Sequence, residues 1–315
     1  MVEAIQVMEP RRETTVPQTI GPELFNRYIA YLDAKPRTIE TYTRTLRPFH
    51  RYMARAGITR PTREDILAYR EGLRHTCKAA TVQAYMLAVR LFFKWTEQEG
   101  IYPNVADRVK GENISREHKK DYLGKHQVVD ILGHIDTATL TGKRDFAVIL
   151  LMTTAGLRTI EVSRANIEDM RIHGDGAVLY VQGKGRDEKA ELVKVALPVE
   201  KAIRDYLKAR GAVNANDPLF ASNSNKNKGG RMTTRSISRL VKGRLVAAGY
   251  SSDRLTAHSL RHTAATINLL EGGTLEETQQ LLRHSSINTT MIYLHHIDRD
   301  KNPSETRIAR AILGA

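Results

Sequence analysis

Arginine, histidine and tyrosine residues recur in three short motifs in the C-terminal half of the chain. Residues 156–161 read Gly-Leu-Arg-Thr-Ile-Glu, residues 258–262 read His-Ser-Leu-Arg-His, and residues 282–285 read Leu-Arg-His-Ser. Tyr293 follows nine residues after His284. Guanidinium groups bind phosphate oxygens well, because they stay charged and offer two parallel donors. Together these residue types indicate chemistry on the phosphate backbone of a nucleic acid.

Arg158 and Arg261 are the candidate phosphate-binding residues. Attack on a phosphodiester builds negative charge on its non-bridging oxygens, and fixed cationic donors stabilise that charge. Arg158 follows Gly-Leu at the end of an apolar predicted helix. His258 lies three residues before Arg261, so the two share one face of a predicted helix.

Tyr293 is the candidate nucleophile, since a phenolate can form a covalent bond to phosphorus. The pKa of a free tyrosine is about 10, so the phenol needs help to lose its proton. His284 and His258 are the candidates for that help. Lys184 stands between glycines in the turn of a predicted hairpin, from which it can reach a leaving oxygen as a general acid. Other lysines near it, Lys189 and Lys194, are weaker candidates.

The charge of the chain favours a polyanion as partner. Its 49 Lys and Arg residues against 35 Asp and Glu give a net charge of +14. The excess is spread along the chain, since residues 21–120 alone carry 19 basic and 11 acidic residues. With 41% apolar and 27% charged residues, the composition is that of a soluble globular protein.

Several classes of protein are disfavoured. A single cysteine, Cys77, allows no intramolecular disulfide and fits a reducing cytoplasm. No apolar run is long enough to span a bilayer, and the N-terminus does not resemble a signal peptide. We expect no metal and no cofactor, because no cluster of His, Asp and Glu has the spacing of metal ligands.

Hydrophobic periodicity predicts a mainly α-helical protein with two domains. Residues 1–20 are polar and are predicted to form a flexible arm. Residues 21–103 are predicted to form a helical domain of four or five helices, beginning near Pro22, Thr38, Thr62 and Ala79. The charged stretch 104–120 lacks an apolar period and is predicted to be a linker.

Residues 121–315 are predicted to form an α-rich catalytic domain with a small antiparallel sheet. Two strands, at 178–181 and 192–197, flank the turn at 183–186. The predicted helices cover 125–135, 141–154, 199–210, 233–248, 259–271, 275–282, 287–294 and 305–313.

The three motifs, taken with the hairpin lysine, resemble the signature motifs of the tyrosine recombinase (phage integrase) family, and the architecture is Xer-like. The resemblance covers about residues 20–300. It implies that Arg158, Lys184, His258, Arg261, His284 and Tyr293 are the catalytic residues and that Glu161 supports them through hydrogen bonds. It also implies a SAM-like N-terminal domain, and a clamp in which the two domains cover opposite faces of a DNA duplex.

The resemblance further implies site-specific recombination of double-stranded DNA by a homo-tetramer, through a 3′-phosphotyrosine and a four-way junction. The C-terminal helix of such enzymes commonly docks on a neighbouring subunit. Arg283 is a departure, because relatives commonly have glycine before the histidine; it is expected to add a phosphate contact or to alter the local turn.

Two other functions remain open at this point. One is a type IB topoisomerase-like swivelase, which uses similar arginine, lysine and tyrosine residues. The other is a DNA-binding protein without catalytic activity. Within the recombinase interpretation, the role is either Xer-like resolution of chromosome dimers or integration of a mobile element. The short N-terminal arm favours the first, and an accessory protein is not identified.

Overall fold

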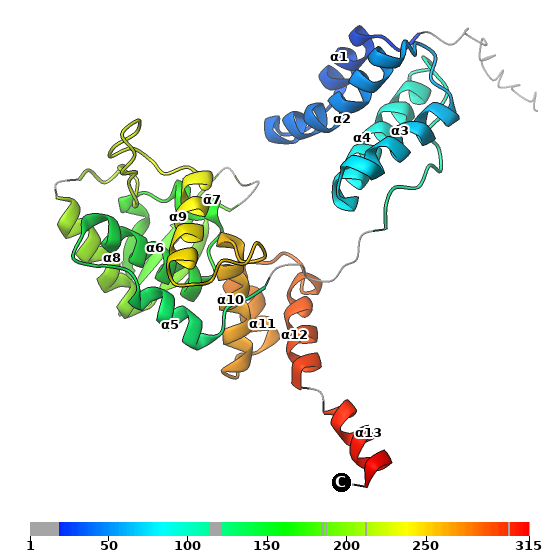
Figure 1. Ribbon diagram of the computed structural model, residues 1–315. Coiled ribbons are helices and arrows are strands. Elements are labelled where there is room, and N and C mark those ends of the chain that lie inside the picture. Colours follow the sequence, from blue (N-terminus) through cyan, green and yellow to red (C-terminus); the bar gives the residue numbers. More distant parts are fainter. Residues whose placement is uncertain are drawn as a thin grey trace, which may run out of the picture. The chain divides into compact units, whose positions relative to one another are not determined.

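The computed structural model describes residues 19–113, 121–183, 186, 188–211, 213–301 and 303–314 (Figure 1). The chain divides into two compact units, one ending at Glu117 and the other beginning at His118. Both are built mainly of helices, and the second also contains a small sheet, as the sequence predicts. None of the helices within these ranges is both long enough and apolar enough to cross a bilayer.

The first unit is a bundle of four helices: α1 (Pro22–Tyr31), α2 (Pro36–Ala56), α3 (Arg63–Thr76) and α4 (Ala79–Gln98). Thr62 caps α3, because its side chain accepts from the amide of Asp65 while Asp65 accepts from the amide of Thr62. An aromatic core joins the helices, with the rings of Phe25 and Phe92 stacked 4.6 Å apart.

The first part of the predicted linker belongs to this bundle. Ala106 and Val109 are buried in its core. Charged side chains of α3 hold the backbone of this segment, since Arg63 donates to the carbonyl of Asp107 at 2.5 Å and Arg70 to that of Lys110 at 3.0 Å. Residues 114–120 lie outside the described residues, as do residues 1–18 of the predicted arm. Ile20, at the end of the predicted arm, is buried.

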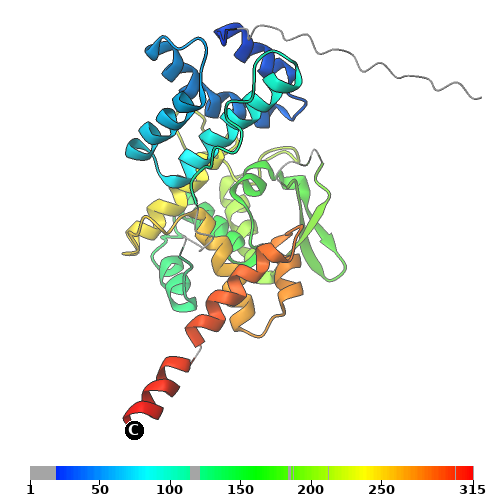
Figure 2. The ribbon, with the colours of Figure 1, turned by 90° about the vertical axis from the view of Figure 1, so that its right-hand side faces the viewer.

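The second unit contains nine α-helices within its described residues. They are α5 (Lys125–Gly133), α6 (Leu140–Ala155), α7 (Thr159–Arg164), α8 (Leu197–Arg210), α9 (Thr234–Ala247), α10 (Ala257–Leu270), α11 (Leu275–Leu282), α12 (Asn288–Lys301) and α13 (Ser304–Leu313). The sequence predicts all of these except α7, which has only six residues. In both views of the ribbon, α10, α11 and α12 lie side by side (Figures 1 and 2).

The sheet has one strand more than the sequence predicts. Strands β1 (Met170–His173), β2 (Gly176–Val181) and β3 (Glu191–Val195) form an antiparallel meander in the order β1-β2-β3. In its register Val178 lies opposite Lys194 and Val181 opposite Glu191. β1 has four residues, three of them exposed, so it lacks the apolar alternation by which a strand is recognised.

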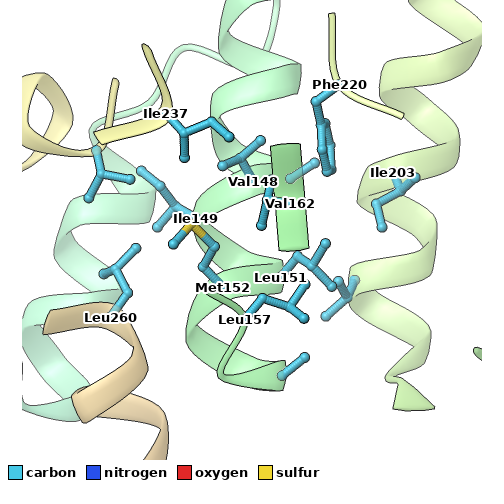
Figure 3. Close-up of a cluster of buried hydrophobic side chains, with 14 of the residues drawn as sticks. Val148, Ile149, Leu151, Met152, Leu157, Val162, Ile203, Phe220, Ile237 and Leu260 are labelled. Carbon is cyan, nitrogen blue, oxygen red and sulfur yellow. The ribbon is translucent and has the colours of Figure 1, made fainter. Parts of the chain in front are cut away.

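Helix α6 is the centre of the second unit's core. Val148, Ile149, Leu151 and Met152 are buried on its different sides (Figure 3). They pack with side chains of α7, α8, α9 and α10, among them Val162, Ile203, Ile237 and Leu260. From Phe146 to Met152 the helix is apolar throughout, so this part of it is enclosed by its neighbours. The position of the turn that follows α6 is therefore fixed by packing.

Candidate active site

The turn after α6 brings the first and third motifs into contact. Gly156 ends α6 in the left-handed conformation, with φ of +58°. A Cβ atom at Gly156 would lie 2.7 Å from Cδ2 of Leu282, at the end of α11. Both the backbone angle and the close approach of α11 therefore favour glycine at this position. Arg158 follows as the residue that precedes α7.

A buried carboxylate, that of Glu161, bonds to two arginines. One oxygen of Glu161 accepts from Nη1 of Arg158 at 2.8 Å, and the other accepts from the Arg158 amide at 2.8 Å and from Nη2 of Arg283 at 2.9 Å. Burial disfavours the charge on Glu161, but Arg283 and Arg158 outweigh it and hold the pKa of this carboxyl below its usual value. Glu161 therefore orients Arg158 as an ionised partner.

Arg283 occupies a position that favours glycine. Its φ is +53°, in the left-handed region, at the residue that ends α11. Its side chain also donates to the carbonyls of Leu281 at 2.7 Å and Ala155 at 3.3 Å. Arg283, which stands where relatives commonly have glycine, thus joins the end of α11 to the α6 turn and to Glu161.

Arg261 is almost completely buried in α10. Its guanidinium donates to the carbonyl of Gly156 at 2.5 Å and to that of Leu282. Burial and the charges of Arg158 and Arg283 lower the pKa of Arg261 to about 9, which leaves it charged at neutral pH. Arg261 thus lies between the turn that carries Arg158 and the end of α11 that carries Arg283.

Tyr293 lies in the same cluster, on α12. Its side chain is 5% exposed, and its hydroxyl lies 2.6 Å from Nδ1 of His262. The ring of His262 packs edge-on against that of His258, with centroids 4.4 Å apart. Burial raises the pKa of Tyr293 to about 12, although the positive charges of Arg261 and Arg158 act in the opposite direction.

His284 lies beside the ring of Tyr293. The two rings are nearly parallel, with centroids 6.5 Å apart. Nδ1 of His284 lies 2.9 Å from the hydroxyl oxygen of Thr290. The pKa of His284 is lowered to about 4, mainly by burial and to a smaller extent by the positive charges of Arg261 and the other nearby arginines. His284 is therefore a neutral hydrogen-bonding group at pH 7.

An open cavity of about 590 Å³ lies next to this cluster. It is lined by Arg158, Gly183, Arg186, Glu191, Arg283, His284, Ser285 and Thr289. Three arginines against one glutamate make it a candidate site for an anion. Lys184 lies outside the described residues, but its neighbours Gly183 and Arg186 line this cavity. Lys189 was a weaker candidate for the general acid. Its Nζ lies 2.5 Å from a buried carboxylate oxygen of Asp169.

The structure thus brings together Arg158, Glu161, His258, Arg261, His284 and Tyr293. His262 belongs to the second motif, but no role was predicted for it. Its position four residues after His258 puts both histidines on one helical face, and that spacing was the available signal. In the described part of the chain, no group of three or more His, Cys, Asp or Glu side chains is placed to hold a metal ion.

Comparison with known proteins gives matches for both units. Residues 121–299 match the phage integrase family, and residues 23–101 match the N-terminal SAM-like domain of phage integrases. The tyrosine recombinase XerD of Listeria monocytogenes is 29% identical over 274 residues, which are 82% of this chain and 87% of that protein. The tyrosine recombinase XerC of Pelobacter propionicus is 30% identical over 272 residues, covering 82% and 85%.

Solved structures share the fold. The XerH site-specific recombinase bound to a palindromic difH substrate, in a post-cleavage complex, aligns with a TM-score of 0.70 and 23% identity over 88% of this chain and 80% of that one. The lambda integrase tetramer bound to a Holliday junction aligns with a TM-score of 0.66 and 16% identity over 86% and 75%.

Proposed function

The chain belongs to the phage integrase family and is a tyrosine-type site-specific DNA recombinase, and from this premise we propose that it cuts and rejoins double-stranded DNA through a 3′-phosphotyrosine on Tyr293. The observation that carries the proposal is the convergence of Arg158, which precedes α7, with Arg261 of α10 and Tyr293 of α12, beside an arginine-lined cavity. Two guanidinium groups near one phenol provide the charge that attack on a phosphodiester requires.

The proposed step replaces one phosphoester with another. The Tyr293 oxygen attacks the scissile phosphorus, while Arg158 and Arg261 bind the non-bridging oxygens and His258 and His284 act as hydrogen-bonding groups. The bond from phosphorus to the 5′-oxygen breaks, and Lys184 donates a proton to that oxygen. A 5′-hydroxyl of a second duplex then attacks the phosphotyrosine and gives a four-way junction, which a second round resolves. Because each ester replaces another, no high-energy cofactor is needed.

Glu161 has a supporting part in this proposal. It does not touch the phosphate, since both of its oxygens accept hydrogen bonds from Arg158 and Arg283. Its contribution is to hold the guanidinium of Arg158 toward the cavity. Preorganised donors need no reorientation when the charge develops, and for that reason they stabilise the transition state efficiently.

We also propose that four copies assemble on two recombination sites. None of the described residues of α13 is buried in this chain, and Ile308, Ile312 and Leu313 are exposed on it. An uncovered apolar helix face fits docking on a neighbouring subunit. The solved tetramer of lambda integrase on a Holliday junction is a precedent for such an assembly. We further propose a cytoplasmic enzyme of a bacterium, similar to the Xer recombinases, that acts in chromosome resolution or in integration of a mobile element.

The experiment begins by identifying the DNA. Sequencing the fragments that copurify covalently with the protein gives the recognised site. A strand-transfer assay with two copies of that site should then yield recombinant duplexes, and Tyr293→Phe should yield none. Relaxation of supercoiled DNA without strand transfer would instead assign the chain a swivelase activity. Binding without any covalent product would mean that the protein only binds DNA.

A further inference from the structure

His262 is a buried histidine to which the mechanism above gives no part. It is 3% exposed and directly follows Arg261 in α10. Its Nδ1 lies 2.6 Å from the hydroxyl oxygen of Tyr293, the atom that must attack phosphorus. That distance is within the range of a hydrogen bond between oxygen and nitrogen. A titratable group in contact with the reacting atom is a candidate for the proton transfer itself.

The helices fix this contact. α10 packs against α12, and the rings of His262 and Tyr293 have centroids 5.3 Å apart. His284 makes a different contact, because its ring lies nearly parallel to that of Tyr293 and its Nδ1 pairs with the Thr290 hydroxyl. Of these two histidines, His262 is the one whose ring nitrogen lies at the phenol oxygen.

We infer that His262 accepts the proton of Tyr293 when the phenol oxygen attacks the scissile phosphate, an inference that rests on the proposed function. As the bond from oxygen to phosphorus forms, the O–H bond breaks and its proton moves to Nδ1. The bond to the 5′-oxygen breaks in the same step, and that oxygen takes its proton from Lys184. The imidazolium of His262 returns the proton to Tyr293 when the strand is rejoined. The neutral His262 must then carry its proton on Nε2.

The need for such an acceptor follows from the burial of the phenol. With its pKa raised to about 12, roughly one Tyr293 side chain in 10⁵ is ionised at pH 7. Waiting for that small population would slow the attack, whereas a base in contact removes the proton as the new bond forms. Removing a general base of this kind typically costs about 10²–10⁴ in rate.

The test uses His262→Asn in the full-length protein, because the Asn oxygen can hold the phenol hydrogen bond but cannot take its proton at neutral pH. The rate of covalent adduct formation is measured in a single turnover on a suicide duplex of the recognised site. We expect a loss of about 10²–10⁴ with duplex binding retained. The exposed His173→Asn, on β1 of the same unit, is the matched control and should cleave like the unaltered protein.

A substrate with sulfur at the bridging 5′ position separates the two proton transfers. A thiolate leaves without a proton, so this substrate should restore cleavage by Lys184→Ala. It should not restore cleavage by His262→Asn, whose defect lies on the nucleophile. A fluorinated tyrosine at position 293, being more acidic, should recover part of the rate lost in His262→Asn. If the Asn variant does not fold, His262→Gln replaces it; this variant also removes the base, although its amide matches Nε2 rather than Nδ1, and the fluorinated tyrosine tests it in the same way.

A His262→Asn protein that forms the adduct as fast as the unaltered protein, or faster, would overturn the inference. So would a slow variant whose rate is insensitive to fluorination, because its defect would then be structural. These results differ from a failure of the proposed function, in which the unaltered protein itself would form no adduct.

Discussion

At the scale of single residues, the candidate site contains one buried carboxylate that is bonded to two arginines. Glu161 is fully buried and receives hydrogen bonds from Arg158 and Arg283. A buried charge is tolerated only when it is paired and hydrogen-bonded. Glu161 therefore positions the arginines, and the arginines keep Glu161 ionised.

A double-mutant cycle tests the bond between Glu161 and Arg283. Glu161→Gln and Arg283→Met should each lower the free energy of unfolding, and the pair should show a coupling energy of about 1–2 kcal/mol because the residues are in direct contact. Urea unfolding of the four proteins gives this value. Additive effects would mean that the contact contributes nothing, and the exposed pair Arg37 and Glu40 on α2 provides a control for which little coupling is expected.

The lowered pKa of His284 predicts that the stability of the protein depends on pH. Its pKa is about 4 in the folded chain and about 6.5 when unperturbed, so between these values the unfolded chain binds the proton more readily. The free energy of unfolding should therefore rise with pH from about 4 to 6.5. Urea titrations across this range should show a smaller rise for His284→Gln. An unchanged slope in that variant would assign the acid sensitivity to other groups.

The sequence alone identified most of the residues that gather at the site, since their types and order in the chain point to phosphate chemistry. It did not give His262 or Arg283 a defined part. The contact of His262 with Tyr293 depends on how α10 packs against α12, and the ion pair of Arg283 depends on the α6 turn meeting the end of α11. Such contacts arise from packing between segments that are far apart in the sequence.

At the scale of elements, most of the long helices were predicted to within a few residues, although α12 extends seven residues beyond its predicted end at Leu294. The short elements α7 and β1 were not predicted. α7 has six residues and β1 has four, too few for a periodic pattern to emerge. The prediction of a linker from residue 104 onward was based on the charge of this stretch and on the absence of a periodic pattern of apolar residues. Its bonds to Arg63 and Arg70 of α3 could not be inferred from composition.

The exposed apolar face of α13 is predicted to act in assembly and not in the stability of the free chain. Ile308→Ser together with Ile312→Ser should leave the stability of the free chain nearly unchanged, because these side chains are 59% and 75% exposed. The same variant should assemble poorly into tetramers on two-site DNA, as measured by light scattering. A loss of stability in the free chain would show that α13 packs on its own subunit, and unaltered assembly would exclude the helix as a docking element.

At the scale of the whole molecule, both units have the charge expected of a protein that binds a polyanion. The net charge of +14 is distributed over both parts of the chain. Lysines and arginines that neutralise phosphates release condensed counterions, and this release makes affinity depend on salt. We therefore expect the proposed cleavage chemistry to depend on the second unit, and the affinity for DNA to depend on the charge of both units.

Affinity for the recognised duplex should therefore fall steeply with salt. With about six to ten phosphate contacts, the association constant should drop by about 10³–10⁵ between 50 and 200 mM salt. Fluorescence anisotropy with a labelled duplex measures this directly. A nearly flat salt dependence would contradict a binding mode based on the phosphate backbone.

The most direct test of the central claim is to map the covalent bond between protein and DNA. A suicide duplex containing the recognised site is incubated with the protein, the product is digested with a protease, and the peptide that carries the nucleotide is identified by mass spectrometry. We predict a 3′-phosphate ester on Tyr293, absent in Tyr293→Phe although that variant still binds the duplex. A nucleotide attached to any other residue, or strand cleavage without an attached peptide, would contradict the account.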